Sequence, residues 1–181
     1  MNTVFLDRDG VINKDLGYVH LWEDFHFLEG SIEALQILTK KNISIIIITN
    51  QSGIARGLFT EQQYNKLMKK FRCVCTELGI NILDILYCPH HPQGKINKYK
   101  TLCNCRKPQP GMIFKAFKKY KLSADKCYLV GDRLSDLKAG YEAGIKNLIL
   151  INKKINYATH SEKFNFQSEN SLYNWVTNLD L

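Results

Sequence analysis

Apolar and polar positions along the chain predict strands and helices in alternation. Five short apolar runs have the length and aliphatic content of buried strands, and they span residues 3–6, 43–50, 82–87, 127–131 and 146–151. The run at 43–50 (ISIIIITN) has almost no polar interruption, which is typical of parallel strands that helices cover on both faces.

Helical signals separate these runs. Residues 31–41 place Ile32, Leu35 and Leu38 at helical spacing. The other signals are a T-x-x-Q capping box at Thr60 and Gln63, Pro110 in the first turn of a helix, and a helix over 134–144 that ends at Gly144. The alternation predicts an open, mostly parallel α/β sheet. Beyond residue 152 the pattern fades, with one weak helical stretch at 171–179.

Length and composition predict a globular, cytoplasmic monomer. The 181 residues correspond to one domain over 1–181, with the segment 88–105 inserted as a loop and 153–181 as a C-terminal tail. Hydrophobic residues make up 45% and charged residues 23%, and no apolar stretch is long enough to suggest a membrane partner. The net charge of +8 comes from scattered lysines, which argues against a nucleic-acid partner. It is explained by a lysine-rich surface or, functionally, by attraction of a small anionic molecule.

Polar side chains follow the predicted strands at the points where ligands bind in such sheets. Asp7 and Asp9 lie two residues apart in LDRDG, so an extended chain turns both to one side, and Asp132 follows a later strand. Three carboxylates favour Mg²⁺ over zinc. Any one of these aspartates alone is equally well explained as a local capping residue, but Thr49 and Lys107 at two more strand ends strengthen the catalytic interpretation.

Four motifs resemble, in order and spacing, those of the haloacid dehalogenase superfamily of phosphohydrolases: DRDG, TNQSG, a lysine before P-x-P-G, and GDRLSD. Within it, GYVH, TNQSGIARG, CPHHPQG and CRKPQPGM resemble the D-glycero-D-manno-heptose 1,7-bisphosphate phosphatases. The resemblance runs from about residue 4 to about residue 152. It implies a Rossmann-like three-layer fold and a phosphorylated sugar as substrate.

The resemblance also implies roles for individual residues. Asp7 is the nucleophile that forms an aspartyl-phosphate, and Asp9 is the general acid and then the general base. Thr49, the Asn50 amide and Lys107 stabilise the phosphoryl oxygens. Catalytic Mg²⁺ is held by Asp7, the Asp9 carbonyl and Asp132, while Asp136 orients Lys107 or a metal-bound water. Residues matching the family's substrate-contacting positions are Asp15, Leu16, Gly17, Tyr18, Thr49, Asn50, Gln51, Ser52, Arg106, Lys107 and Arg133, the last of which is lysine in many members.

Cysteine and histidine cluster in the segment 88–105. Cys88, His90, Cys103 and Cys105 supply three sulfurs and one imidazole, a set suited to closed, structural tetrahedral zinc, with His91 as a spare. Because Lys107 lies two residues beyond Cys105, this site is expected to fix the backbone position from which the Lys107 side chain extends. The remaining cysteines, Cys73, Cys75 and Cys127, are expected to lie outside it.

Two segments are too short for the cap domain that the superfamily usually carries. Only about twenty residues separate Gly10 from Ile32, and essentially one helix separates Gly53 from Ile82. The preferred function is removal of the C7 phosphate. A histidinol-phosphate phosphatase is the alternative, for which we expect TNQDG instead of TNQSGIARG, and a non-catalytic zinc-bearing module is a third hypothesis that the presence of both Asp7 and Asp9 disfavours.

Overall fold

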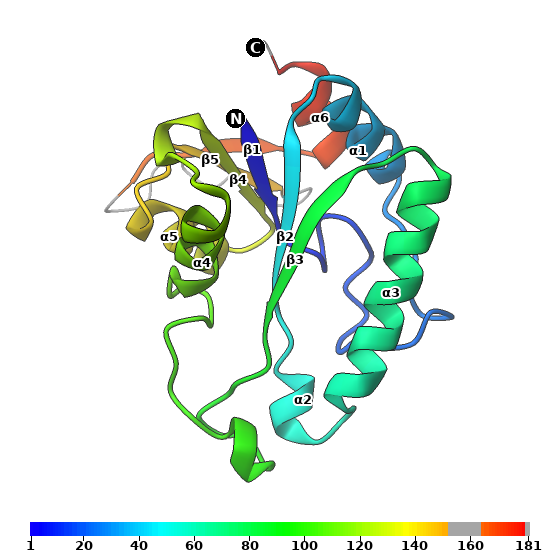
Figure 1. Cartoon of the computed structure of the whole chain (residues 1–181), viewed down its shortest axis with the longest axis vertical. Helices are drawn as coiled ribbons and strands as arrows, with labels where there is room; N and C mark the ends of the chain where they lie inside the picture. The colour runs from blue at the N-terminus through cyan, green and yellow to red at the C-terminus, as the bar shows by residue number, and fades with distance from the viewer. Residues whose placement is uncertain (152–163, 180–181) are drawn as a thin grey trace.

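The computed structural model describes residues 1–151 and 164–179 and contains one six-stranded sheet (Figure 1). The strand order is β3-β2-β1-β4-β5-β6, and every neighbouring pair is parallel. The strands are β1 (Thr3–Leu6), β2 (Ser44–Asn50), β3 (Ile82–Cys88), β4 (Cys127–Gly131), β5 (Asn147–Ile151) and β6 (Gln167–Glu169). The predicted parallel α/β sheet is therefore confirmed.

Helices connect the strands and cover both faces of the sheet. They are α1 (Ser31–Lys40), α2 (Gly53–Arg56), α3 (Glu61–Glu77), α4 (Gly111–Tyr120), α5 (Leu134–Glu142) and α6 (Leu172–Thr177), with 3₁₀ turns η1 (Asn97–Tyr99) and η2 (Ala124–Lys126). In Figure 1, α4 and α5 lie on one side of the strands, and α1, α3 and α6 lie on the other. None of the helices in the described ranges is long and apolar enough to cross a membrane.

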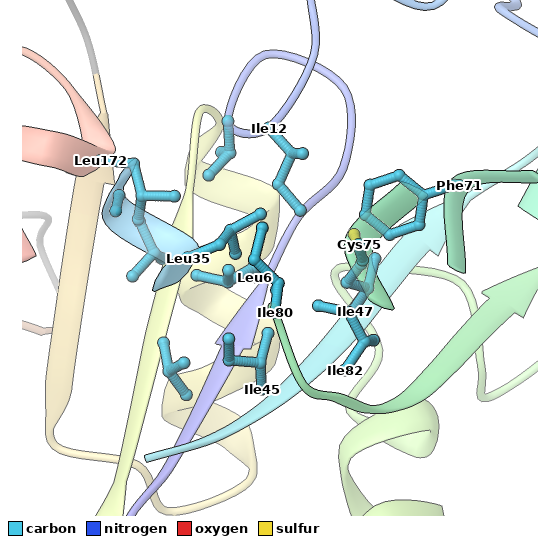
Figure 2. Packing of buried hydrophobic residues seen from close by; sticks show 14 of the residues in the cluster. Leu6, Ile12, Leu35, Ile45, Ile47, Phe71, Cys75, Ile80, Ile82 and Leu172 are labelled. Atoms are coloured by element: carbon cyan, nitrogen blue, oxygen red, sulfur yellow. The ribbon is translucent and has the colours of Figure 1, made fainter. Parts of the chain in front are cut away.

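Two hydrophobic cores separate the layers, because successive residues of a strand point to opposite faces. Leu6, Ile45 and Ile47 pack with α1, α3 and α6, whereas Phe5 and Ile46 pack with α4 and α5. Figure 2 shows the first core, where the side chains of these three strand residues meet those of the helices. Burial on both faces explains the unbroken apolar run of β2.

Local signals at the helix ends have mixed outcomes. The capping box of α3 is present, with the Thr60 side chain accepting from the Gln63 backbone and Gln63 accepting from the Thr60 backbone. Gly144 follows α5 with a φ of 85°, a left-handed conformation that favours glycine. Pro110 occupies the N-cap of α4 instead of its first turn, so the helix begins one residue later than predicted, at Gly111.

The C-terminal segment contributes more than its sequence pattern indicated. The weak helical stretch forms α6, and its Leu172, Trp175 and Val176 are buried in the first core. A short strand, β6, extends the sheet next to β5 and was not predicted. Three residues are too few to show a period, and only the neighbouring strand supplies the partner for the backbone of β6. The other part of the expected tail, 152–163, lies outside the described residues.

The strand order places β1 between β2 and β4. The chain therefore adds β2 and β3 on one side of β1, and β4, β5 and β6 on the other side. In such sheets the ligand crevice lies outside the carboxyl ends at this switch point. The segment from Asp7 to Gly30 contains only turns, bends and isolated bridges, and α2 and α3 fill the interval between β2 and β3. The loop after β3 and helix α2 lie together beyond the strand ends, at the bottom of Figure 1.

Candidate active site

A polar cavity of about 640 Å³ lies at the carboxyl ends of the central strands. Nearly all predicted catalytic and substrate-contacting residues line it, and they are Asp7, Asp9, Asp15, Gly17, Tyr18, Thr49, Asn50, Gln51, Ser52, Arg106, Lys107 and Arg133. Leu16 is the exception, since it is absent from the lining and its side chain is 57% exposed. Matching positions within a loop do not determine which side chains turn inward. Arg56 and Ser135 also line the cavity and were not predicted to do so.

Lys107 is buried and its ammonium lies between two carboxylates. Its Nζ is 2.8 Å from Asp7 Oδ1 and 2.7 Å from Asp136 Oδ1, and it donates to the Ile48 carbonyl at 2.9 Å. Burial alone lowers the pKa of Lys107, but the charges of Asp136 and Asp7 outweigh it and the net direction is upward. Lys107 is therefore a fixed cation, and Asp136 contacts it as one of the two predicted roles requires.

Asp136 also caps the helix that carries it. Its Oδ2 accepts from the Arg133 backbone N at 3.0 Å, at the start of α5. A Cβ added at Gly131 would collide with the Asp136 carboxylate, so the close approach of β4 to α5 needs glycine there. With one oxygen on Lys107 and the other on the helix N-terminus, both oxygens of Asp136 are held in place.

The carboxylates of Asp7, Asp132 and Asp136 lie close enough to share one cation, with ligand atoms within 4.8 Å of one another. Burial raises the pKa of Asp7 to about 8 despite the opposing charge of Lys107, and burial with the Asp136 charge raises the pKa of Asp132 to about 6. Asp132 Oδ1 is buried without a hydrogen-bond partner in the described chain. These carboxylates thus need another cation, and a hard divalent ion fits this all-oxygen set.

Asp9 is held by donors from three other residues. Arg8 Nε and Nη2 lie 3.1 and 2.8 Å from its oxygens, and Asn13 Nδ2 and Gln51 Nε2 donate at 3.0 and 3.2 Å. The Arg8 guanidinium is buried 6.0 Å from the Phe25 ring centroid and 5.9 Å from that of Tyr64. Sequence reasoning missed Arg8 and Asn13, although a second charged residue beside Asp7 at the end of a buried strand was a signal for Arg8.

The end of β2 is joined to the segment that carries Lys107. Asn50 Nδ2 donates to the Lys107 carbonyl at 3.0 Å, and the Lys107 backbone N donates to Asn50 Oδ1 at 3.1 Å. Gln51 Nε2 donates to Thr49 Oγ1 at 2.9 Å. These bonds hold Thr49 and Lys107 against the same part of the cavity.

The loop after β3 brings the four predicted zinc ligands together. Cys88 Sγ lies 3.1 Å from Cys105 Sγ and 3.5 Å from Cys103 Sγ, and His90 Nδ1 is 3.3 Å from Cys105 Sγ. A tetrahedral ion with Zn–S bonds of about 2.3 Å separates its sulfurs by roughly 3.8 Å, somewhat more than these separations, so the sulfurs would spread slightly around a bound ion. The hydrogen bond between Cys88 and Cys105 lowers the pKa of Cys105 to about 5 and, together with burial, raises the pKa of Cys88, so Cys105 is the more acidic thiol of this pair. Cys73, Cys75 and Cys127 lie outside the cluster, as predicted.

Comparison with known proteins agrees with this geometry. The family described as "Polynucleotide kinase 3 phosphatase" matches residues 5–173. The D-glycero-alpha-D-manno-heptose-1,7-bisphosphate 7-phosphatase of Photorhabdus laumondii is 43% identical, over 96% of this chain and 93% of its own length. The chain belongs to the heptose-bisphosphate 7-phosphatase family of the haloacid dehalogenase superfamily. The D-glycero-beta-D-manno-heptose-1,7-bisphosphate 7-phosphatase of Escherichia coli K12 is 41% identical, over 82% of this chain and 78% of its own.

Solved structures agree with the family assignment. The D,D-heptose 1,7-bisphosphate phosphatase of B. bronchiseptica, in complex with magnesium and phosphate, has a TM-score of 0.84 and 31% identity, covering 98% of this chain and 97% of that one. A putative phosphatase of the same superfamily from Mesorhizobium loti has a TM-score of 0.87 and 28% identity, covering 98% of this chain and 85% of that one. The superfamily and its fold, predicted from four short motifs, are confirmed.

Proposed function

We propose that this protein hydrolyses the C7 phosphate of D-glycero-D-manno-heptose 1,7-bisphosphate and leaves the C1 phosphate in place. The observation that carries the proposal is the buried array of Asp7, Lys107 and Asp136 at a polar cavity, in a chain 43% identical to a phosphatase of that name. The array provides a carboxylate and a fixed positive charge, and the cavity provides space for a phosphorylated sugar.

Asp7 is the proposed nucleophile. Its Oδ1 is held by Lys107 Nζ and by the Arg8 backbone N, at 2.8 and 2.7 Å, so the carboxylate has one orientation. Attack on phosphorus forms an aspartyl-phosphate and releases the C7 oxygen of the sugar, and water then hydrolyses the acyl phosphate to free Asp7. Phosphoryl transfer depends on positive charge and donors around the equatorial oxygens, which Lys107, the Thr49 hydroxyl and the Asn50 amide supply.

Asp9 is the proposed acid and base. It donates a proton to the departing sugar oxygen and takes one from the water that attacks the intermediate. The donors of Arg8, Asn13 and Gln51 fix its carboxylate beside Asp7 in the cavity wall. One side chain then serves both half-reactions.

Each metal has its own set of ligands. Mg²⁺ would be held by Asp7, Asp132 and the backbone carbonyl of Asp9, while Asp136 stays on Lys107 and the α5 N-terminus. A bound Mg²⁺ neutralises charge on the phosphoryl oxygens. Zinc would be held by Cys88, His90, Cys103 and Cys105, and four protein ligands leave no position for substrate, so its role is structural.

Sugar recognition is proposed for the rim of the cavity. Arg133 Nη2 donates to Asp15 Oδ2 at 2.8 Å, so two predicted substrate residues hold each other there. Gly17 and Tyr18 follow Asp15, and the Gly17 backbone N donates to Asp15 Oδ1 at 3.0 Å. Arg106 lies at the cavity next to Lys107. For the protein as a whole, we propose a cytoplasmic monomer with no nucleic-acid or membrane partner.

A phosphate-release assay with both anomers of the bisphosphate and with histidinol phosphate tests the function. We expect turnover of at least one anomer and little release from histidinol phosphate. Preference for histidinol phosphate would instead support the alternative activity, and no turnover of any of the three, with magnesium present, would contradict the proposal.

A further inference from the structure

Arg56 is a cavity residue that the mechanism above does not use. It is the last residue of α2, three residues beyond the TNQSG segment, and it lines the same cavity as Asp7 and Lys107. Its Nε is buried without a hydrogen-bond partner in the part of the chain that the structure describes. A guanidinium with an unused donor at a substrate cavity is suited to an oxyanion ligand.

The three arginines of this cavity differ in how their charges are compensated. Arg133 is paired with Asp15 at 2.8 Å, whereas Arg56 and Arg106 form no ion pair among the described residues. Arg106 Nη1, like Arg56 Nε, is buried without a partner there. Leaving buried donors unpaired costs free energy that a bound anion recovers. Lys107 is not available for a second anion, because Asp7 and Asp136 already hold it.

The loop after β3, which carries the proposed zinc ligands, holds Arg56 in place. Arg56 Nη2 lies 3.0 Å from His91 Nε2, one residue beyond the zinc ligand His90. His91 Nδ1 lies 3.1 Å from the backbone N of Gln93, and a neutral ring accepts at only one nitrogen. The Gln93 backbone N–H, which donates to Nδ1, and the Arg56 guanidinium thus compete for one acceptor nitrogen. The charged guanidinium is the stronger donor, and the N–H of the exposed Gln93 can bond to water instead, so we assign His91 Nε2 as the acceptor for Arg56.

The backbone of the loop is also attached to α2. The Ala55 carbonyl accepts from the backbone N of Lys95 at 2.7 Å and of Ile96 at 2.9 Å. A Cβ at Gly94 would lie 2.9 Å from both the Cβ and the carbonyl oxygen of Ala55, so this contact depends on glycine. The loop therefore fixes the helix that carries Arg56 as well as its side chain.

From these contacts we propose that Arg56, positioned by His91, determines specificity by binding the phosphate that is not hydrolysed. The inference rests on the proposed function, which requires a substrate with two phosphates. Lys107 acts on the phosphate that is transferred, and Arg56 with Arg106 binds the one that stays on the sugar. The loop that Cys88, His90, Cys103 and Cys105 close then positions both phosphate sites.

The test compares heptose 1,7-bisphosphate with heptose 7-phosphate, which lacks the second phosphate. For Arg56→Gln we expect KM for the bisphosphate to rise on the order of tenfold to a hundredfold, with kcat much less affected. For the monophosphate, both constants should stay within about twofold of wild type, because the substrate offers Arg56 no phosphate. Inhibition by the product heptose 1-phosphate should weaken by a similar factor. The control is Lys66→Gln, which removes one charge at an exposed position of α3.

The positioning role of His91 is tested with His91→Ala and His91→Gln, with zinc content measured for each. We expect the alanine protein to lose part of the bisphosphate preference and keep its zinc, and the glutamine protein to regain the preference because its side-chain carbonyl accepts from Arg56. Loss of zinc in His91→Ala, or equal losses on both substrates, would contradict the positioning role. An Arg56→Gln protein that keeps the wild-type preference would overturn the Arg56 assignment alone. Wild-type protein that releases no phosphate from the bisphosphate would instead overturn the proposed function.

Discussion

At the scale of single residues, the site is built from buried charged groups that pair with one another. Lys107 lies between Asp7 and Asp136, and Arg8 is buried against Asp9. Buried pairs of this kind are weak sources of net stability, but removing one partner leaves an uncompensated charge. In this site the pairs orient the side chains, because each charged group is held in one position by its partner.

Asp7→Asn tests the nucleophile. The amide keeps the size of the side chain but lacks the attacking charge, so turnover should fall by more than about a thousandfold while the protein remains folded. Circular dichroism measures whether the protein is folded, and a phosphate-release assay measures turnover. The control for loss of a carboxylate is Asp125→Asn at an exposed position. Turnover within about tenfold of wild type would show that another group attacks phosphorus.

At the scale of elements, the loop after β3 joins the cluster of Cys88, His90, Cys103 and Cys105 to the strand ends at the cavity. Cys105 lies two residues before Lys107, and the backbone of Lys107 is bonded to Asn50 at the end of β2. Movement of the loop would therefore shift the lysine, although no proposed zinc ligand lines the cavity.

Cys105→Ser tests this coupling. Loss of one ligand should release the metal, loosen the loop and displace Lys107, and a displacement of ~1 Å costs on the order of a hundredfold in rate. Proteolysis should increase between residues 91 and 102, while Cys73→Ser, an exposed thiol on α3, should behave as wild type. A Cys105→Ser protein without zinc but with normal kinetics would separate the loop from catalysis.

At the scale of the whole molecule, the two cores on either side of the sheet hold the strand ends in register. The C-terminal helix α6 completes one core by packing on α1, with Trp175 only 3% exposed. We propose that the chain is one domain, in which the C-terminal segment is part of the cooperative structure.

Trp175→Ala tests the domain proposal. Truncation of a buried tryptophan should lower the free energy of unfolding by about 3–5 kcal/mol and retain a single transition. Tyr173→Ala, at a 40% exposed position of the same helix, should cost much less. Denaturant unfolding followed by two probes measures both, and separate transitions for the two probes would indicate that the C-terminal segment unfolds independently.

The proposal that magnesium is catalytic and zinc structural also concerns the whole protein. Brief EDTA treatment should abolish activity, because the carboxylate site is open and its ligands are hard, and magnesium alone should restore it. Zinc should stay bound at about one per chain, because a closed thiolate site releases metal slowly. Metal analysis beside the activity assay measures this. A requirement for added zinc, or protein purified without zinc, would contradict the assignment.

The sequence by itself determined the layered sheet, the family and most of the cavity residues, because these depend on periodicity and on short motifs at strand ends. The apolar run of β2, the D-x-D of Asp7 and Asp9, and the paired cysteines of the loop are local features of this kind. Only the folded chain shows that Gln51 binds Asp9, that Asp136 reaches Lys107 while it caps α5, and that Arg56 meets His91, 35 positions away. Those contacts depend on which side chains face one another after the strands pair and the loop closes, and no local pattern encodes that geometry. For the same reason, the short strand β6 has no signal of its own and exists only beside β5.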